Sequence, residues 1–138
     1  MTRPVHILLV EDNPGDVRLT IEALKESQFP SNLHVVRDGV EALDYLRNVA
    51  LPDLILLDLN LPRRSGREVL TEIKADPALR RIPVMVLSTS RSDADVQFSY
   101  DHHANCYIQK PMELDRFFDV VRSIEQFWCS VASLPATS

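Results

Sequence analysis

Short apolar runs of strand length alternate with helical patterns five times along the chain. The runs lie at Val5–Val10, Leu33–Arg37, Leu54–Leu59, Pro83–Leu87 and Cys106–Gln109. Near-continuous apolar runs of this kind are typical of strands buried on both faces, as in a parallel sheet. Strands that alternate with helices across short loops predict one α/β domain, with helices covering both faces of the sheet.

The segments between the runs carry signals for the start and end of five helices. Asn13 can cap a helix whose first turn holds Pro14, and Asp38-Gly39 is interpreted as the end of the second strand. Asp76-Pro77 ends the third helix, and a polar fourth helix is expected from about Asp93 to His102. The last helix has one apolar face, made by Leu114, Phe117, Val121, Ile124 and Trp128.

Charge and hydropathy exclude several classes of function. The net charge is −5 and the isoelectric point is near 5.3, whereas nucleic-acid binding usually needs a clustered basic face. The densest basic cluster, Arg63, Arg64 and Arg67, is interpreted as a solvated loop. No apolar run is long enough to span a membrane or to serve as a signal peptide. The two cysteines, Cys106 and Cys129, form neither a disulfide framework nor a zinc site, so we expect a cytoplasmic protein.

Acidic residues gather where the first and third strands end. Glu11-Asp12 follows the first apolar run, and Asp58 is the one charged residue of the third. Glu11 and Asp12 alone would also suit a helix cap, but a charge inside Leu-Ile-Leu-Leu-Asp-Leu is costly unless it is paired or bound to a metal. Ligands in open parallel sheets sit beyond the carboxyl ends of the strands. If the two strands are neighbours, the three carboxylates converge there.

The polar residues at the strand ends suit phosphoryl transfer. Carboxylates without His or Cys favour Mg²⁺ or Mn²⁺, and the main-chain carbonyl of Asn60 is a further candidate ligand. Ser88 ends the fourth strand with a hydroxyl donor, and Lys110 follows the fifth strand as a flexible cation. A carboxylate nucleophile at Asp58, a metal, a hydroxyl and a cation together predict a phosphoryl-transfer site.

These motifs resemble the response-regulator receiver domains of two-component signalling. The resemblance extends from about Val5 to Gln126 and rests on Glu11-Asp12, Asp58-Leu59-Asn60-Leu61-Pro62, Ser88 and Lys110-Pro111. It implies a flavodoxin-like, doubly wound sheet of five parallel strands in the order 2-1-3-4-5, with five helices. It also implies that Asp58 takes a phosphoryl group from a phosphohistidine of a sensor histidine kinase. On this basis residues 1–126 are the receiver domain.

The resemblance also implies how phosphorylation is read. In receivers the hydroxyl on the fourth strand and an aromatic residue on the fifth move together, and the matching positions are Ser88 and Tyr107. A static, half-buried Tyr107 is the alternative. The family often has Gly-Ala before its fifth strand, where this chain has His103-Ala104, so the local turn is expected to differ.

The end of the chain resembles a narrower group, the small response regulators that partner phytochrome-type kinases. The similar residues are Tyr100-Asp101, Asn105-Cys106-Tyr107-Ile108, the Ser-Ile-Glu-Gln-Phe-Trp of the last helix and the Leu-Pro that follows. Residues 127–138 form a C-terminal extension that is more apolar than a frayed terminus needs. We therefore expect a homodimer whose interface includes Phe127, Trp128, Val131 and Leu134.

Three other functions compete with a stand-alone signalling receiver that is not a turnover enzyme. A phosphatase of the haloacid-dehalogenase type needs a second Asp two residues after its nucleophile, and this chain has Asn60 there. A flavodoxin-like flavin binder needs a phosphate-binding loop after the first strand, and Glu11-Asp12-Asn13-Pro14 would repel phosphate. A degenerate receiver without phosphorylation is disfavoured because all the site residues are present.

Overall fold

A computed structural model describes residues 5–25, 31–88, 93–104 and 106–109 of the chain. Its strands are β1 (Val5–Val10), β2 (Ser31–Val36), β3 (Leu54–Asp58), β4 (Val84–Ser88) and β5 (Cys106–Gln109). Its helices are α1 (Pro14–Lys25), α2 (Gly39–Asn48), α3 (Gly66–Ala75) and α4 (Asp93–Asp101). None of these helices is long and apolar enough to cross a membrane.

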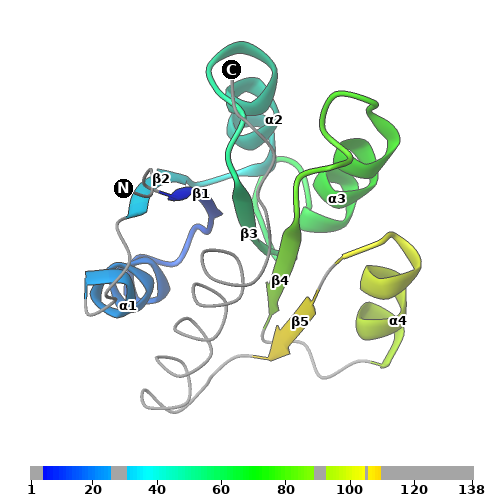
Figure 1. The fold of residues 1–138 in the computed structure, drawn as a ribbon. Coiled ribbons are helices and arrows are strands. Elements are labelled where there is room, and N and C mark those ends of the chain that lie inside the picture. Colours follow the sequence, from blue (N-terminus) through cyan, green and yellow to red (C-terminus); the bar gives the residue numbers. More distant parts are fainter. Residues whose placement is uncertain (1–4, 26–30, 89–92, 105, 110–138) are drawn as a thin grey trace.

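The strands form one parallel sheet in the order β2-β1-β3-β4-β5, as the resemblance to receiver domains implies (Figure 1). The expected fifth helix and C-terminal extension lie outside the described residues. So do Lys110 and the four residues expected in a dimer interface, Phe127, Trp128, Val131 and Leu134.

Two apolar cores lie on the two faces of the sheet. Helix α1 covers one face, while α2, α3 and α4 lie against the other (Figure 1). Because successive side chains of a strand point to opposite faces, each buried strand contributes to both cores. The core under α2 and α3 contains Leu8, Val10, Ile55, Leu57, Val84 and Val86; the core under α1 contains Ile7, Leu9, Leu54, Leu56, Met85 and Leu87.

Side-chain caps set where three of the helices begin. The Asn13 side chain accepts hydrogen bonds from the N–H groups of Gly15 and Asp16, as the sequence suggests. Ser65 caps α3 by accepting from the N–H of Glu68 at 3.3 Å. Asp38 accepts from the N–H of Glu41 at 2.8 Å, so this residue begins α2 rather than only ending the strand before it.

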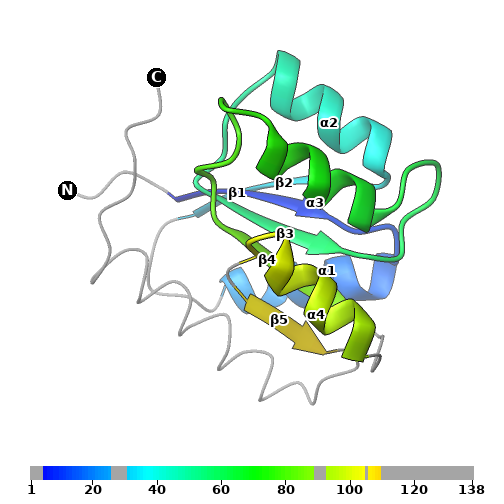
Figure 2. The ribbon, with the colours of Figure 1, turned by 90° about the vertical axis from the view of Figure 1, so that its right-hand side faces the viewer.

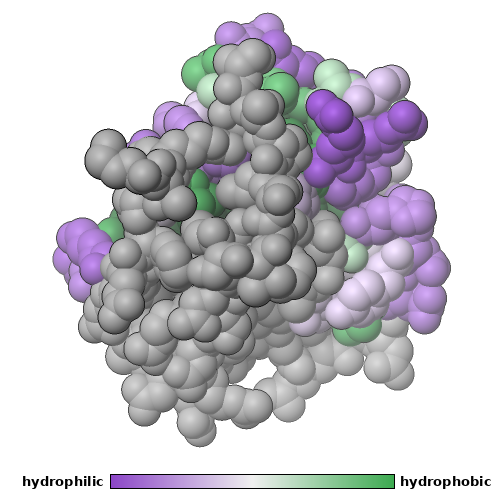
Figure 3. All heavy atoms as spheres, viewed as in Figure 1, coloured by the Kyte–Doolittle hydropathy of each residue, from purple (hydrophilic) through white to green (hydrophobic). Residues whose placement is uncertain are grey.

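The outer surface of the described residues is mainly polar. Hydrophilic residues gather over α3 and α4, on the right-hand side of Figure 3. The exposed large apolar side chains of these residues are few: Leu19, Val49, Leu51 and Tyr100. Single exposed apolar residues of this kind are normal for a protein surface. The described polar residues that the sequence nominates for a functional site lie instead at the edge of the sheet where the carboxyl ends of the parallel strands meet (Figure 2).

Candidate phosphoryl-transfer site

Three carboxylates converge at the carboxyl ends of β1 and β3. One oxygen from each of Glu11, Asp12 and Asp58 lies within 4.8 Å of the other two. The strand register explains this convergence, because Val10 pairs with Leu57 and so places Glu11 beside Asp58. By the alternation of strand side chains, both of these carboxylates point to the face that α1 covers.

Two of the three carboxylates are buried. Glu11 is 1% exposed and Asp58 is 6% exposed, while Asp12 is exposed. Main-chain N–H groups reach the buried pair: Asn60 donates to Asp58 Oδ1 at 2.9 Å, and Asn13 donates to Glu11 Oε2 at 3.3 Å. Such bonds stabilise each carboxylate but do not remove the repulsion between like charges a few ångströms apart.

The donor set suits a hard divalent cation. Carboxylate oxygens, without sulfur or imidazole, are the ligands of Mg²⁺ and Mn²⁺, and a cation among them would neutralise the cluster. Among the described residues this is the one group of three or more His, Cys, Asp or Glu side chains close enough to share an ion. The side chains that the sequence nominates as metal ligands are therefore brought together.

Ser88 and Tyr107 lie on the neighbouring strands β4 and β5, and Ser88 directly follows Leu87, the residue that pairs with Asp58. Ser88 is fully buried at the end of β4, and Tyr107 of β5 pairs with Val86, two residues earlier on β4. Val86 and the half-buried Tyr107 both contact the core under α2 and α3. Ser88 follows Val86 by two positions, so the pleat directs it to that same face. The structure thus places these two residues on the same face of neighbouring strands, two positions apart in register.

The loop from Asn60 to Ser65 leaves the site and leads into α3. Its two ends are joined by a hydrogen bond from the N–H of Gly66 to the carbonyl of Leu59, at 3.0 Å. A Cβ on Gly66 would lie 2.2 Å from the carbonyl oxygen of Asp58. No other residue fits there without a shift, because no heavy atom can approach a backbone oxygen so closely. Gly66 therefore lets α3 begin directly against the Asp58 main chain.

Sequence reasoning missed several residues around this loop. The interpretation of the arginine cluster as a solvated loop is wrong for two of its members: Arg67 belongs to α3, and Arg64 is half-buried and ion-paired. Arg67 forms an ion pair with Asp95 and lies over the Phe98 ring, so it connects α3 to α4. The available signal was the helical spacing of four residues between Arg64, Glu68 and Glu72, but it does not reveal the partners on other helices.

Comparisons with known proteins agree with this geometry. The sequence model of the family described as the response regulator receiver domain matches residues 7–122 of this chain. Response regulator Rcp1 of Synechocystis sp. is 49% identical over 139 aligned positions, which cover 96% of this chain and 95% of that protein.

Two solved structures superpose over nearly the whole chain. One is the phosphorylated cyanobacterial phytochrome response regulator RcpA, with a TM-score of 0.89, 54% identity and coverage of 97% of this chain and 100% of that one. The other is the Mn²⁺-bound form of Rcp1, with a TM-score of 0.88, 49% identity and coverage of 96% and 100%. Fold, site geometry and sequence thus agree: this chain belongs to the family of response regulator receiver domains.

Proposed function

We propose that the chain is a single-domain response regulator that accepts a phosphoryl group on Asp58 from a sensor histidine kinase of the phytochrome type. The observation that carries this proposal is the convergence of Asp58 with Glu11 and Asp12 within 4.8 Å at the carboxyl edge of the sheet. The phytochrome assignment is supported by similarity to Rcp1 and RcpA.

The transfer exchanges one bond to phosphorus for another. A carboxylate oxygen of Asp58 bonds to phosphorus while the P–N bond of the phosphohistidine breaks, and the electron pair of that bond returns to the imidazole nitrogen. The N–H of Asn60 holds Oδ1 of Asp58 at 2.9 Å, which fixes the direction in which the carboxylate faces. Such positioning lowers the entropic part of the barrier.

Mg²⁺ or Mn²⁺ is the proposed cofactor, held by the carboxylates of Glu11, Asp12 and Asp58 and by the main-chain carbonyl of Asn60. When bound, the ion supplies positive charge that offsets the repulsion between the carboxylates and the incoming phosphoryl oxygens. Ser88 is proposed to donate its hydroxyl to a phosphoryl oxygen. Lys110, which lies outside the described residues, is proposed to pair with the same group.

The output is proposed to be a protein contact rather than a product. Movement of Ser88 toward the phosphoryl group would leave space on the face that it shares with Tyr107, and the ring would turn into that space. The proposed protein is therefore a phosphoacceptor of the cytoplasm with no separate metabolite as substrate.

Residues 127–138 are proposed as a dimerisation extension beyond a receiver domain of residues 1–126. The proposal rests on the apolar side chains of Phe127, Trp128, Val131 and Leu134. Light scattering after size exclusion should show a dimer for the full chain and a monomer for a chain truncated after Gln126. An unchanged oligomer would remove the extension from the interface.

Intact-mass measurement tests the phosphoacceptor directly. Wild type incubated with acetyl phosphate and Mg²⁺ should gain one labile phosphoryl adduct, and EDTA should prevent it. Asp58→Asn should gain none. The matched control is Asp53→Asn, which changes the buried aspartate at the other end of β3 and should keep the adduct.

Two results would contradict the assignment. An adduct on Asp58→Asn would move the phosphoacceptor to another residue. Steady hydrolysis of phosphomonoesters by purified wild type would instead favour a phosphatase.

A further inference from the structure

The loop that carries Asn60 contains a strained turn. The N–H of Arg64 donates to the carbonyl of Pro62 at 2.7 Å, and the residue between them, Arg63, has φ of 64°. A turn closed over three residues with positive φ at its centre is rare and strained for a residue other than glycine. Such a turn persists only where the surrounding structure holds it in place.

Helix α2 holds one side of this turn. Arg63 Nη1 lies 3.2 Å from Asp38 Oδ2, and Asp38 is the residue that caps α2. The next residue, Gly39, touches the main chain of Arg64: a Cβ on Gly39 would lie 2.1 Å from the Arg64 carbonyl oxygen. The first turn of α2 therefore packs directly on the backbone of the strained turn.

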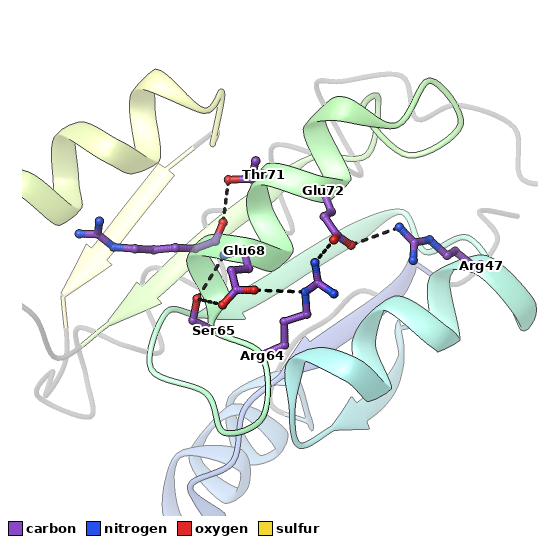
Figure 4. Close-up of polar contacts among 7 residues, drawn as sticks. Arg47, Arg64, Ser65, Glu68, Thr71 and Glu72 are labelled. Atoms are coloured by element: carbon purple, nitrogen blue, oxygen red, sulfur yellow. Dashed lines mark hydrogen bonds and ion pairs between the residues drawn. The ribbon is translucent and has the colours of Figure 1, made fainter.

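Helix α3 holds the other side through the Arg64 side chain. Arg64 Nη2 pairs with Glu72 Oε1, and Arg64 Nε lies 3.5 Å from Glu68 Oε2. Glu72 is shared, since its Oε2 lies 3.2 Å from Nη2 of Arg47 in the last turn of α2. Figure 4 shows Glu72 between the two arginines, with Glu68 on the other side of Arg64. Arg64 is thus an ionic link from the loop to α3 and, through Glu72, to α2.

These anchors constrain Asn60 from both directions along the chain. On one side, the N–H of Asn60 donates to Asp58 Oδ1, and the carbonyl of Leu59 accepts from Gly66. On the other side, the turn at Pro62–Arg64 begins two residues later. Because the chain is held at Leu59 on one side and at Pro62 on the other, the orientation of the Asn60 peptide depends on the turn. A change in the turn would therefore be transmitted to the Asn60 carbonyl.

We infer that Arg64 is a positioning residue for the metal site: its link to Glu72 holds the strained turn and so fixes the direction of the Asn60 carbonyl. This inference rests on the proposed function, because that function assigns the carbonyl to the metal. Ion pairs at a surface contribute little stability one at a time, so the role concerns geometry more than folding.

The direction in which each substitution changes metal affinity distinguishes a positioning role from a direct effect of charge. Arg64 is a cation near a cation site, so its charge alone opposes metal binding, and removing that charge should tighten binding. Loss of the anionic Glu72 should weaken binding by the same argument, and the double variant should return to wild type. If Arg64 positions the loop through Glu72, both single variants weaken binding, and the double variant resembles either of them.

The experiment is a titration of metal-free full-length protein with Mn²⁺, followed by the electron paramagnetic resonance signal of the free ion. The variants are Arg64→Met, Glu72→Met and the double variant. The control is Arg80→Met, which removes an exposed arginine with no ion pair among the described residues. We expect the Kd for Mn²⁺ to rise roughly tenfold in the three test variants and to stay unchanged in the control.

Two further measurements keep the inference open to refutation. Arg64→Lys keeps the positive charge but lacks the planar guanidinium group, so its Kd for Mn²⁺ should rise by a smaller factor than that of Arg64→Met. This variant also tests the inference if Arg64→Met fails to fold. Urea unfolding in EDTA reports any purely structural role, which would lower the midpoint and leave the Kd unchanged.

The outcomes distinguish this inference from the proposed function. If wild type binds Mn²⁺ and Arg64→Met binds it equally or more tightly, the positioning role is wrong and the proposed function stands. If wild type binds no Mn²⁺, or Asp58→Asn binds it as tightly as wild type, the proposed metal site fails, and the role of Arg64 fails with it.

Discussion

Two buried aspartates lie at opposite ends of β3 and show how the two edges of the sheet differ. Asp53, just before the strand, is 3% exposed, and Asp58, its last residue, is 6% exposed. Oδ2 of Asp53 accepts from the N–H of His6 at 2.9 Å, and its own N–H donates to the carbonyl of His6 at 2.7 Å. This reciprocal pair joins the loop before β3 to β1. Asp58 instead lies among other carboxylates.

Buried charges at the amino-terminal edge meet main-chain dipoles, whereas the buried carboxylates at the carboxyl edge meet like charges in addition to main-chain N–H groups. Besides Asp53, Lys74 at the end of α3 donates to the carbonyls of Arg80 and Ile82, at 3.1 and 2.8 Å. At the carboxyl edge, Asp58 shares its space with Glu11 and Asp12. Burial is therefore common to both aspartates, and the carboxylates around Asp58 are what set it apart.

The largest change in unfolding free energy is expected where α3 packs against the Asp58 main chain, at the carboxyl edge of the sheet. In Gly66→Ala the new Cβ would lie 2.2 Å from the Asp58 carbonyl oxygen, so α3 or the strand end must shift. We expect a loss of about 3 kcal/mol in the free energy of unfolding, measured by urea denaturation. The control is Gly15→Ala in α1, whose Cβ meets only the Asn13 side chain, at 3.2 Å. Equal effects in the two variants would show that the edge adapts easily.

A smaller effect, opposite in sign at the two ends of β3, is expected when each aspartate becomes asparagine. In metal-free buffer, Asp58→Asn removes one of three repelling carboxylates and should stabilise the protein by about 1 kcal/mol. Asp53→Asn keeps an acceptor for His6 but loses its charge, so it should destabilise by about 1 kcal/mol. Urea unfolding in EDTA measures both. A loss of stability in both variants would mean that the acidic cluster is not under electrostatic repulsion.

The smallest effect concerns Lys74 and the pH dependence of stability. Burial lowers the pKa of the Lys74 ammonium from its ordinary value of 10.5. Between the lowered pKa and 10.5 the unfolded chain binds more protons than the folded one, so the unfolding free energy rises with pH in that window. Lys74→Met lacks this titration. The stability of wild type relative to the variant should therefore increase as the pH rises toward 10.5, and only slightly, because solvent screens this half-exposed ammonium.

The prediction for Lys74 is wrong if the stability of wild type relative to Lys74→Met stays constant or falls as the pH rises toward 10.5. It would show that the two hydrogen bonds to main-chain carbonyls favour the charged form as much as burial disfavours it. Urea midpoints of the two proteins, compared at each pH, are sufficient for the measurement.

The sequence alone predicted the strands, the helices between them and the edge of the sheet at which the acids lie, but that the acids meet depends on β1 and β3 being neighbours. Strands buried on both faces have to be apolar, so their ends are marked by the first polar residues, and parallel strands bring those ends to one edge. Glu11, Asp12 and Asp58 were predictable for this reason. The order of the strands came from the family resemblance, because periodicity says which residues are buried and not which strands are neighbours.

Only the tertiary structure decided how the loop after Asp58 is held. Gly39 touches the backbone of Arg64, Gly66 touches that of Asp58, and Arg63 and Arg64 find partners on two helices. Sequence patterns report periodic burial within one element, whereas these contacts depend on how α2 and α3 pack across the sheet. Charged side chains on a surface have several partners within reach, and the fold selects among them by geometry, which composition does not encode.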